Sequence, residues 1–251
     1  MPNLILATTG PGEPEIFHSL QGEGVAAGRP SVFVRLSGCN LRCHWCDTPY
    51  TWNFEGTAYG HRDDRPDAPA KHARDGNRLV WPVEQLAEAI RSFDCPHLVF
   101  TGGEPLLQQP ALAALCVELG DGFHVEIESN GTVALTPGFD PHVHQLNLSP
   151  KLSHSLNDEA TRLKPQVLAG YATDPRAWFK FVIASPEDVA EVDQVAQANG
   201  MKPERILLMP EGVTSAAVRE RMAWLAPICL ERGYRLSDRL HIHLYGDTRG
   251  T

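Results

Sequence analysis

Predicted strands and helices alternate along most of the chain, and this alternation limits the folds that the sequence can adopt. Buried strands are predicted at residues 30–38, 97–101, 123–129, 144–149, 178–184, 205–210 and 239–246. Helices are predicted at residues 82–93, 110–119, 186–199 and 214–232, where apolar residues recur at helical spacing. Strands that are joined through helices run parallel, so the pattern predicts an α/β fold, either a β/α barrel or an open doubly wound sheet.

Polar or glycine-rich runs follow five of these predicted strands. A cysteine-rich run follows the first strand, and the others are "TGGEP" (101–105), "ESNGT" (128–132), "SPK" (149–151) and "MPEG" (209–212). In β/α barrels the carboxyl ends of the parallel strands form the face that carries the chemistry. We therefore expect the five runs to meet in one site.

Three cysteines, Cys39, Cys43 and Cys46, lie in the first of these runs with the spacing C-x-x-x-C-x-x-C. Three is an odd number for disulfides and one fewer than a structural zinc site needs. Cys116 and Cys229 fall among apolar residues in predicted helices, where buried free cysteine is the ordinary interpretation. Three cysteines on one short loop instead suit three irons of a 4Fe-4S cluster, which leaves the fourth iron open to a small ligand.

Composition narrows the class of protein. The formal net charge is -9 and the pI is about 5.6, which argues against a broad nucleic-acid surface. No apolar run of about 18 residues predicts a transmembrane helix, and the first residues do not resemble a signal peptide. We predict a cytoplasmic protein, in which clustered thiols bind metal rather than form disulfides. The 251 residues are expected to form a single domain (1–251), with an exposed insertion at 56–77 that is rich in charge, Pro and Gly.

The cysteine spacing together with "TGGEP" resembles the radical S-adenosylmethionine superfamily. In that superfamily the open iron binds the amino and carboxylate groups of S-adenosylmethionine, and one-electron reduction releases a 5′-deoxyadenosyl radical. The resemblance implies a partial TIM-like β/α barrel with roughly six parallel strands. Gly102 and Gly103 would let the backbone approach the methionine amino group, and Glu104 would accept a hydrogen bond from it.

Further motifs resemble the 7-carboxy-7-deazaguanine synthase family, namely "FHSLQGEG", "RLSGCNLRCHWCDT", "ESNG", "SPK" and "HLYGDTRG". The resemblance implies a lyase that converts 6-carboxytetrahydropterin to 7-carboxy-7-deazaguanine with loss of ammonia. That reaction belongs to 7-deazapurine (queuosine, preQ0) biosynthesis and supplies a tRNA modification pathway. The family also implies Mg2+, a reductant such as flavodoxin or ferredoxin and a homodimer, without direct contact to nucleic acid or membrane.

The resemblance also implies roles for individual residues. Cys39, Cys43 and Cys46 would bind the cluster, and Thr48 would bind Mg2+. Substrate would be bound by Leu20, Gln21, Gly22, Arg35 and Thr101. S-adenosylmethionine would be bound by Trp45, Cys46, Asp47, Gly103, Glu104, Asn130, Ser149, Pro150, Lys151, Met209, Pro210, Glu211 and Gly212.

Residue chemistry supports two of these assignments. Gln21 offers both a donor and an acceptor to a pterin edge. Arg35 lies beside apolar residues on a predicted strand and needs an anion, which is either the substrate carboxylate or an internal carboxylate. Lys180 and His243 are expected to face the interior as well, if the strand register is right.

Two other interpretations stay open at this point. A glycyl-radical activating enzyme shares the cysteine spacing, but it needs a groove for a partner protein and no "SLQGEG" run. A non-catalytic iron–sulfur or zinc module would serve as an electron carrier or scaffold and has no use for "TGGEP" or an open iron. Some family members carry a longer insertion between the first two cysteines, whereas this chain has the short spacing and the 56–77 insertion instead.

Overall fold

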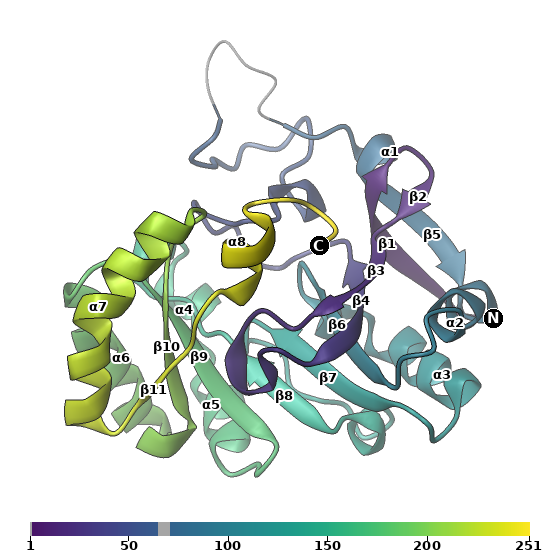
Figure 1. The fold of residues 1–251 in the computed structure, drawn as a ribbon. Helices are drawn as coiled ribbons and strands as arrows, with labels where there is room; N and C mark the ends of the chain where they lie inside the picture. The colour runs from purple at the N-terminus through teal and green to yellow at the C-terminus, as the bar shows by residue number, and fades with distance from the viewer. Residues whose placement is uncertain (1, 65–70) are drawn as a thin grey trace.

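The computed structural model describes residues 2–64 and 71–251, so residues 65–70 of the predicted insertion lie outside the described residues. In the described residues one open sheet has the strand order β11-β10-β9-β8-β7-β6-β4-β1-β2, with β3 beside β4 and β5 beside β1 (Figure 1). The strands are β1 (Asn3–Gly10), β2 (Glu13–Pro14), β3 (Ile16–Leu20), β4 (Pro30–Leu36), β5 (Arg78–Pro82), β6 (His97–Gly102), β7 (His124–Ser129), β8 (Gln145–Leu148), β9 (Ala177–Ile183), β10 (Ile206–Pro210) and β11 (Arg235–Leu236).

Seven neighbouring strands form the parallel part of the sheet, in the order β4-β6-β7-β8-β9-β10-β11. Every neighbouring pair in this part is parallel, from β4 with β6 through to β10 with β11. Parallel strands covered by helices are apolar along their whole length, and all five residues of β10 are buried. The sheet curves without closing, which confirms the predicted partial barrel.

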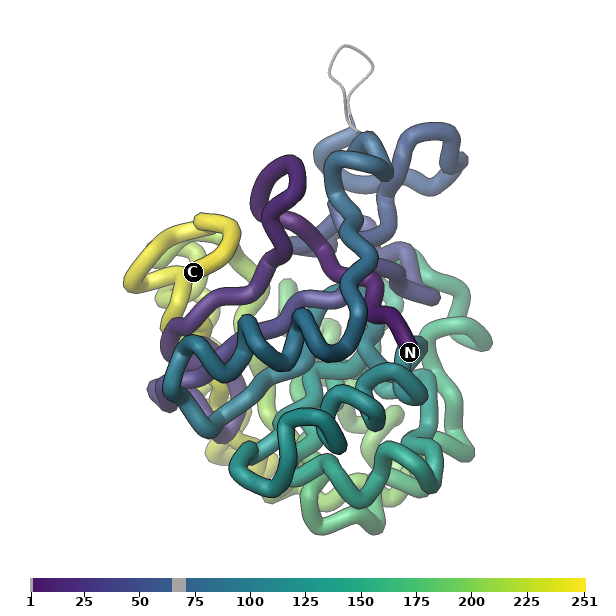
Figure 2. Tube along the Cα trace, turned by 90° about the vertical axis from the view of Figure 1, so that its right-hand side faces the viewer, coloured from purple at the N-terminus to yellow at the C-terminus, as the bar shows by residue number. Residues whose placement is uncertain are grey.

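Helices cover the outer face of the parallel strands. Phe100, Phe179 and Phe181 are fully buried members of the core cluster, and α2 adds Leu86 and Ile90. Helices α2 and α3 pack side by side, as Figure 2 shows from their side of the molecule. The helices are α1 (Arg74–Asn77), α2 (Val83–Arg91), α3 (Gln109–Leu119), α4 (Glu159–Arg162), α5 (Pro165–Ala172), α6 (Glu187–Asn199), α7 (Ser215–Arg232) and α8 (Leu240–Tyr245).

The predicted strand at 239–246 is wrong, because residues Leu240–Tyr245 form helix α8. Leu240, Ile242 and Leu244 alternate with polar residues, which imitates a half-buried strand. In the structure Ile242 is buried, whereas Leu244 is 50% exposed. The antiparallel strands β1, β3 and β5, which extend the sheet beyond β4, were not predicted from the sequence.

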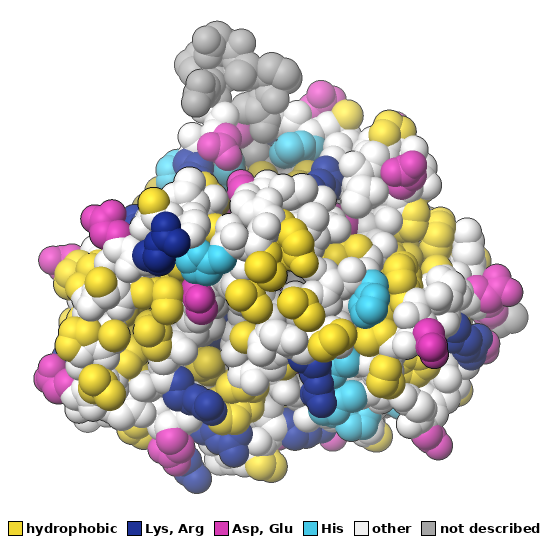
Figure 3. All heavy atoms as spheres, in the orientation of Figure 1, with side chains coloured by type: hydrophobic (Ala, Val, Ile, Leu, Met, Phe, Trp, Pro, Cys, Tyr) yellow, Lys and Arg dark blue, Asp and Glu magenta, His cyan; other side chains and the backbone are white. Residues whose placement is uncertain are grey.

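The described part of the predicted insertion is more than an exposed loop. His61 is buried, and residues 74–77 form α1. On the face seen in Figure 3, basic and acidic side chains are scattered among apolar and uncharged ones. None of the helices described by the structure has the length and apolar character to cross a membrane.

Candidate functional site

One cavity of about 280 Å³ lies where the five predicted runs meet, at the carboxyl ends of the parallel strands. A second cavity, of about 120 Å³, is lined by none of the five runs. Most predicted site residues line the larger cavity, namely Leu20, Gln21, Gly22, Arg35, Cys39, Cys43, Trp45, Cys46, Asp47, Thr48, Thr101, Gly103, Asn130, Ser149, Lys151 and Met209. The remaining predicted residues, which are not among those that line it, are Glu104, Pro150, Pro210, Glu211 and Gly212.

The cysteine loop follows β4 and folds as a tight turn, in which Cys46 N donates to Cys43 O at 3.1 Å. Donors already point at two of the sulfurs. Leu41 N lies 3.4 Å from Cys39 Sγ, and Asn157 Nδ2 lies 3.4 Å from Cys43 Sγ. Burial raises the pKa of Cys39 to about 12 and that of Cys43 to about 11, so both are neutral thiols when no metal is bound.

The residues of this loop fit a 4Fe-4S cluster. Among the described residues no three His, Cys, Asp or Glu side chains converge on a point that one ion could occupy. A cluster binds each thiolate to a different iron, so its three ligands need only line one cavity, as these do. The positive irons would reverse the burial penalty on the thiolates. Trp45 Nε1 is also buried there without a partner in the part of the chain that the structure describes.

Two backbone segments, the end of β6 and the start of the cysteine loop, lie so close together that only glycine fits at Gly102 and Gly103. A Cβ on Gly103 would lie 2.0 Å from Gly38 O, and one on Gly102 would lie 2.1 Å from Leu36 O. Gly102 also has a φ of +125°, a conformation that favours glycine. Gly103 N donates to Leu36 O at 3.0 Å. The pair therefore lets β6 end directly against the start of the cysteine loop.

Glu104 lies behind this contact and is fully buried. Its carboxylate accepts hydrogen bonds from Leu106 N, Ser129 Oγ and Asn130 N at 2.7–3.1 Å. Burial raises its pKa, and these donors oppose that rise. Glu104 thus joins "TGGEP" to "ESNG", whereas its predicted bond to the cofactor amino group stays a prediction.

A buried ionic network forms one wall of the cavity. Lys180 Nζ donates to Glu23 Oε2 at 2.5 Å and to Glu128 Oε2 at 2.9 Å. Burial would raise the pKa of Glu23, but Lys180 and Arg239 hold it far below its usual range. Burial would lower the pKa of Lys180, but the two glutamates raise it. Both groups therefore stay charged, and the expectation that Lys180 faces the interior is confirmed.

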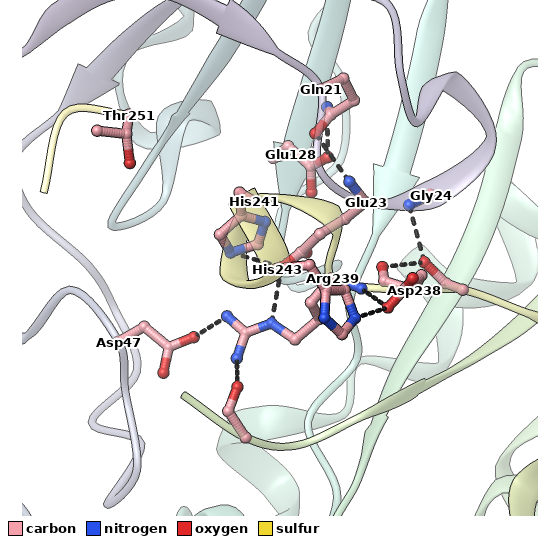
Figure 4. Close-up of polar contacts among 12 residues, drawn as sticks. Gln21, Glu23, Gly24, Asp47, Glu128, Asp238, Arg239, His241, His243 and Thr251 are labelled. Carbon is pink, nitrogen blue, oxygen red and sulfur yellow. Dashed lines mark hydrogen bonds and ion pairs between the residues drawn. The ribbon is translucent and has the colours of Figure 1, made fainter. Parts of the chain in front are cut away.

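The C-terminal segment completes this wall (Figure 4). Arg239 bonds Glu23 at 3.1 Å and Asp47 at 2.5 Å, which connects it to the cysteine loop. A Cβ on Gly22 would lie 2.1 Å from the His241 ring, so the glycine of "LQG" makes room for this histidine. Burial lowers the pKa of His241. His243, in contrast, bonds Ser215 and Asp238 and does not line the cavity.

Arg35 has an internal carboxylate as its nearest partner. Its Nε donates to Glu15 Oε1 at 2.7 Å, and Tyr50 and Arg249 contact the same carboxylate. The alternative of an internal carboxylate is confirmed. Arg35 also lines the cavity beside Thr101 of the next strand, and its bond to a substrate carboxylate stays a prediction. Four further residues that line the cavity were not predicted from the sequence, namely Glu23, Glu128, Arg239 and His241. Glu23 and Glu128 lie within the "QGEG" and "ESNG" runs, whereas no motif marked Arg239 and His241.

Comparisons with known proteins decide the family. The sequence model of the Radical SAM superfamily matches residues 33–142. The 7-carboxy-7-deazaguanine synthase of Pyrobaculum aerophilum is 37% identical over 94% of this chain and 95% of its own. The chain belongs to the 7-carboxy-7-deazaguanine synthase family. The family member from Halobacterium salinarum is 34% identical over 96% of this chain and 94% of its own.

A solved structure of the family agrees with this assignment. The crystal structure of QueE from Escherichia coli has a TM-score of 0.65 and 26% identity, with 95% of each chain covered. The fold, with its open and mostly parallel sheet, is therefore that of a radical SAM enzyme of this family. The same membership sets aside the activating-enzyme and electron-carrier interpretations.

Proposed function

We propose that this chain converts 6-carboxytetrahydropterin to 7-carboxy-7-deazaguanine and ammonia, the reaction that its family name and motifs imply. The observation that carries the proposal is one cavity that brings a three-thiol loop together with basic and acidic side chains. The loop supplies Cys39, Cys43 and Cys46 for a cluster. Arg35 and Lys151 add positive charge to the lining of the cavity, and Glu128 adds an acceptor for N–H groups.

This charge pattern suits a pterin that carries a carboxylate. Arg35 lines the cavity and bonds Glu15 through Nε, so its terminal nitrogens would be the donors to an anionic group of the ligand. Glu128 is held by Lys180 in a position to accept N–H donors of the ring. A ligand with an acidic end and a donor-rich end would therefore bind in one orientation.

The cofactors would meet the other residues that line the cavity. When bound, the cluster and S-adenosylmethionine supply reversible hydrogen-atom transfer to and from the substrate. Trp45, Asn130, Ser149 and Lys151 line the cavity and would hold the cofactor. Thr48, whose hydroxyl lies 3.7 Å from Cys46 Sγ, would be the protein's ligand to Mg2+, with substrate oxygens supplying further ligands.

The proposal extends to the cellular setting. A small protein such as flavodoxin or ferredoxin would reduce the cluster, and the enzyme would act in the cytoplasm as a homodimer. Support for this comes from the family resemblance and from the clustered thiols. The product would enter 7-deazapurine biosynthesis.

The test is an anaerobic assay of the reconstituted protein with reductant, Mg2+, S-adenosylmethionine and 6-carboxytetrahydropterin, with product identified by mass. We expect 7-carboxy-7-deazaguanine from the wild type and none from Cys43→Ala, which removes one cluster ligand. Cys116→Ala is the matched control, because Cys116 is buried in α3 away from the cavity. Cleavage of S-adenosylmethionine without this product would exclude the proposed substrate.

A further inference from the structure

A second layer of polar residues lies under the substrate end of the cavity. Strand β7 directs two glutamates to the same face, because Glu126 and Glu128 are two residues apart. Glu128 lines the cavity, whereas Glu126 is fully buried and is not among the residues that line it. A buried carboxylate is costly unless each oxygen has a donor. The partners of Glu126 therefore show what it does.

Two side-chain amides connect the two carboxylates. Gln21 Nε2 lies 2.6 Å from Glu126 Oε1 and 3.2 Å from Glu128 Oε1. Asn147 Nδ2 lies 2.6 Å and 3.0 Å from the same two oxygens. Ionised carboxylates only accept hydrogen bonds, so the NH2 groups of both amides must face the glutamates. Figure 4 shows Gln21 directed toward Glu128.

His97 holds Glu126 from the opposite side. Its Nε2 lies 2.9 Å from Glu126 Oε2, so this nitrogen carries the proton and donates. The ring is buried and stacks on His124 with the centroids 4.7 Å apart, which fixes its orientation. His97 Nδ1 has no partner among the described residues, so the ring is held there by its bond to Glu126 and by the His124 stack. Each oxygen of Glu126 thus has at least one donor.

These contacts fix the orientation of the Gln21 amide. Both protons of its amide are used by carboxylates, and its Oε1 accepts only from Glu23 N at 3.2 Å within the described chain. A carbonyl oxygen can accept a second hydrogen bond, so Gln21 meets a ligand as an acceptor. This differs from the sequence-based expectation that Gln21 offers both a donor and an acceptor.

We propose that Glu126, held by His97, is a positioning residue that fixes the Gln21 amide as an acceptor for an N–H group of the substrate. The inference rests on the proposed function, because it takes a tetrahydropterin as the donor. An apolar side chain at position 126 would be cheaper to bury, and it would leave Gln21 free to turn its amide. Glu126 and His97 would thus determine which edge of the pterin ring faces Gln21.

The variant Glu126→Gln tests this, because it keeps the size of the side chain but adds an NH2 group that can oppose the Gln21 amide. We expect the KM for 6-carboxytetrahydropterin to rise about tenfold, the cost of one misdirected hydrogen bond, with kcat changed less than about threefold. Iron content and the affinity for S-adenosylmethionine should stay at wild-type values. Glu88→Gln, at an exposed position on α2, is the matched control and should change none of these quantities.

A double-mutant cycle shows whether Glu126 acts through Gln21. If it does, Gln21→Ala and the double variant should have KM values within about twofold of each other. Independent multiplication of the two effects would overturn the proposal. His97→Gln retains an amide donor and should have a KM nearer the wild type than His97→Leu, which removes the donor. Equal values for these two variants would also count against the role of His97.

Substrate affinity provides a readout without turnover. The dissociation constant of 6-carboxytetrahydropterin can be measured by calorimetry on cluster-loaded, S-adenosylmethionine-bound protein without reductant. We expect Glu126→Gln to raise it about tenfold. A wild type that neither binds nor converts this pterin would contradict the proposed function. A wild type that does both, beside a Glu126→Gln variant with unchanged affinity and KM, would overturn only the present inference.

Discussion

At the scale of single residues, the shape of the site depends on two glycines, because a Cβ atom at either position would collide with another part of the chain. Gly103 and Gly22 each leave a space that another part of the chain fills, Gly38 in one case and His241 in the other. In both, the glycine lets an N-terminal segment contact a segment distant in sequence. These contacts place the cysteine loop and the C-terminal helix around one cavity.

Gly103→Ala should therefore destabilise the protein and disturb the cluster site. The new Cβ would lie 2.0 Å from Gly38 O, and backbone cannot move aside as a flexible side chain can. We expect a loss of more than about 3 kcal/mol in the free energy of unfolding, with reduced iron binding after reconstitution. Urea unfolding and iron analysis measure the two effects. A Gly103→Ala protein with wild-type stability and full iron content would contradict this account.

The matched control is Gly170→Ala, which should raise the free energy of unfolding rather than lower it. Gly170 is exposed within α5, and a Cβ there would meet nothing within 4 Å. Alanine is a better helix former than glycine, so Gly170→Ala should stabilise the protein by about 0.5–1 kcal/mol.

At the scale of elements, the described part of the insertion supports the cysteine loop. His61 Nε2 lies 2.9 Å from Cys46 O, and Arg62 N donates to His44 O at 2.8 Å. A carbonyl only accepts, so Nε2 carries the proton, and Nδ1 accepts from Asp63 N at 3.2 Å. Arg62 also bonds Glu211 at 2.9 Å, beyond the end of β10. Residues 61–62 thus connect two loops of the site.

His61→Ala should loosen the cysteine loop from outside the cavity. We expect iron to be lost to a chelator about tenfold faster, because groups that orient the ligands of a metal centre affect its retention by this order. The release can be followed by the decay of the cluster's visible absorption under anaerobic conditions. His18→Ala, at an exposed position on β3, is the control. Equal release rates for the two variants would mean that His61 does not support the loop.

Local sequence signals predicted the parallel part of the fold, whereas elements that depend on contacts between distant residues could not be predicted. Apolar runs followed by Gly-rich turns identified β4, β6 and β10 and placed their ends at one site. No local signal marked α8, whose alternating apolar residues resemble a strand. The helix forms where Leu240 N donates to Gly22 O at 2.8 Å, a contact between opposite ends of the chain. For the same reason Arg239 and His241 were not predicted as site residues.

At the scale of the whole molecule, ionisable side chains gather at both ends of the parallel strands. The glutamate, lysine and arginine network lies at the carboxyl ends, around the cavity. At the amino ends, the rings of His97 and His124 stack with their centroids 4.7 Å apart, and the His144 ring is tilted against His124 at 5.0 Å. One member of each group shows how they respond to pH. Glu23, whose pKa is lowered, affects stability only when the pH falls below about 4.5, whereas His124 acts from about 6.5 downward.

His124 should make the protein less stable as the pH falls from 6.5 toward 4. Burial, with the neighbouring His97 and His144, lowers the pKa of His124 to about 4. In this range the unfolded chain binds a proton that the folded protein does not, so the free energy of unfolding decreases with falling pH. His124→Phe keeps an aromatic ring in the stack and removes the titration. The variant should lose about 1–2 kcal/mol less than the wild type between pH 7 and 4.5, allowing for screening of a partly exposed ring. Urea unfolding at several pH values measures the difference, with His18→Phe as the exposed control.

Parallel pH profiles for His124→Phe and the wild type would show that the folded protein already accommodates a charged His124. In that case the stack of three histidines would be no source of acid instability.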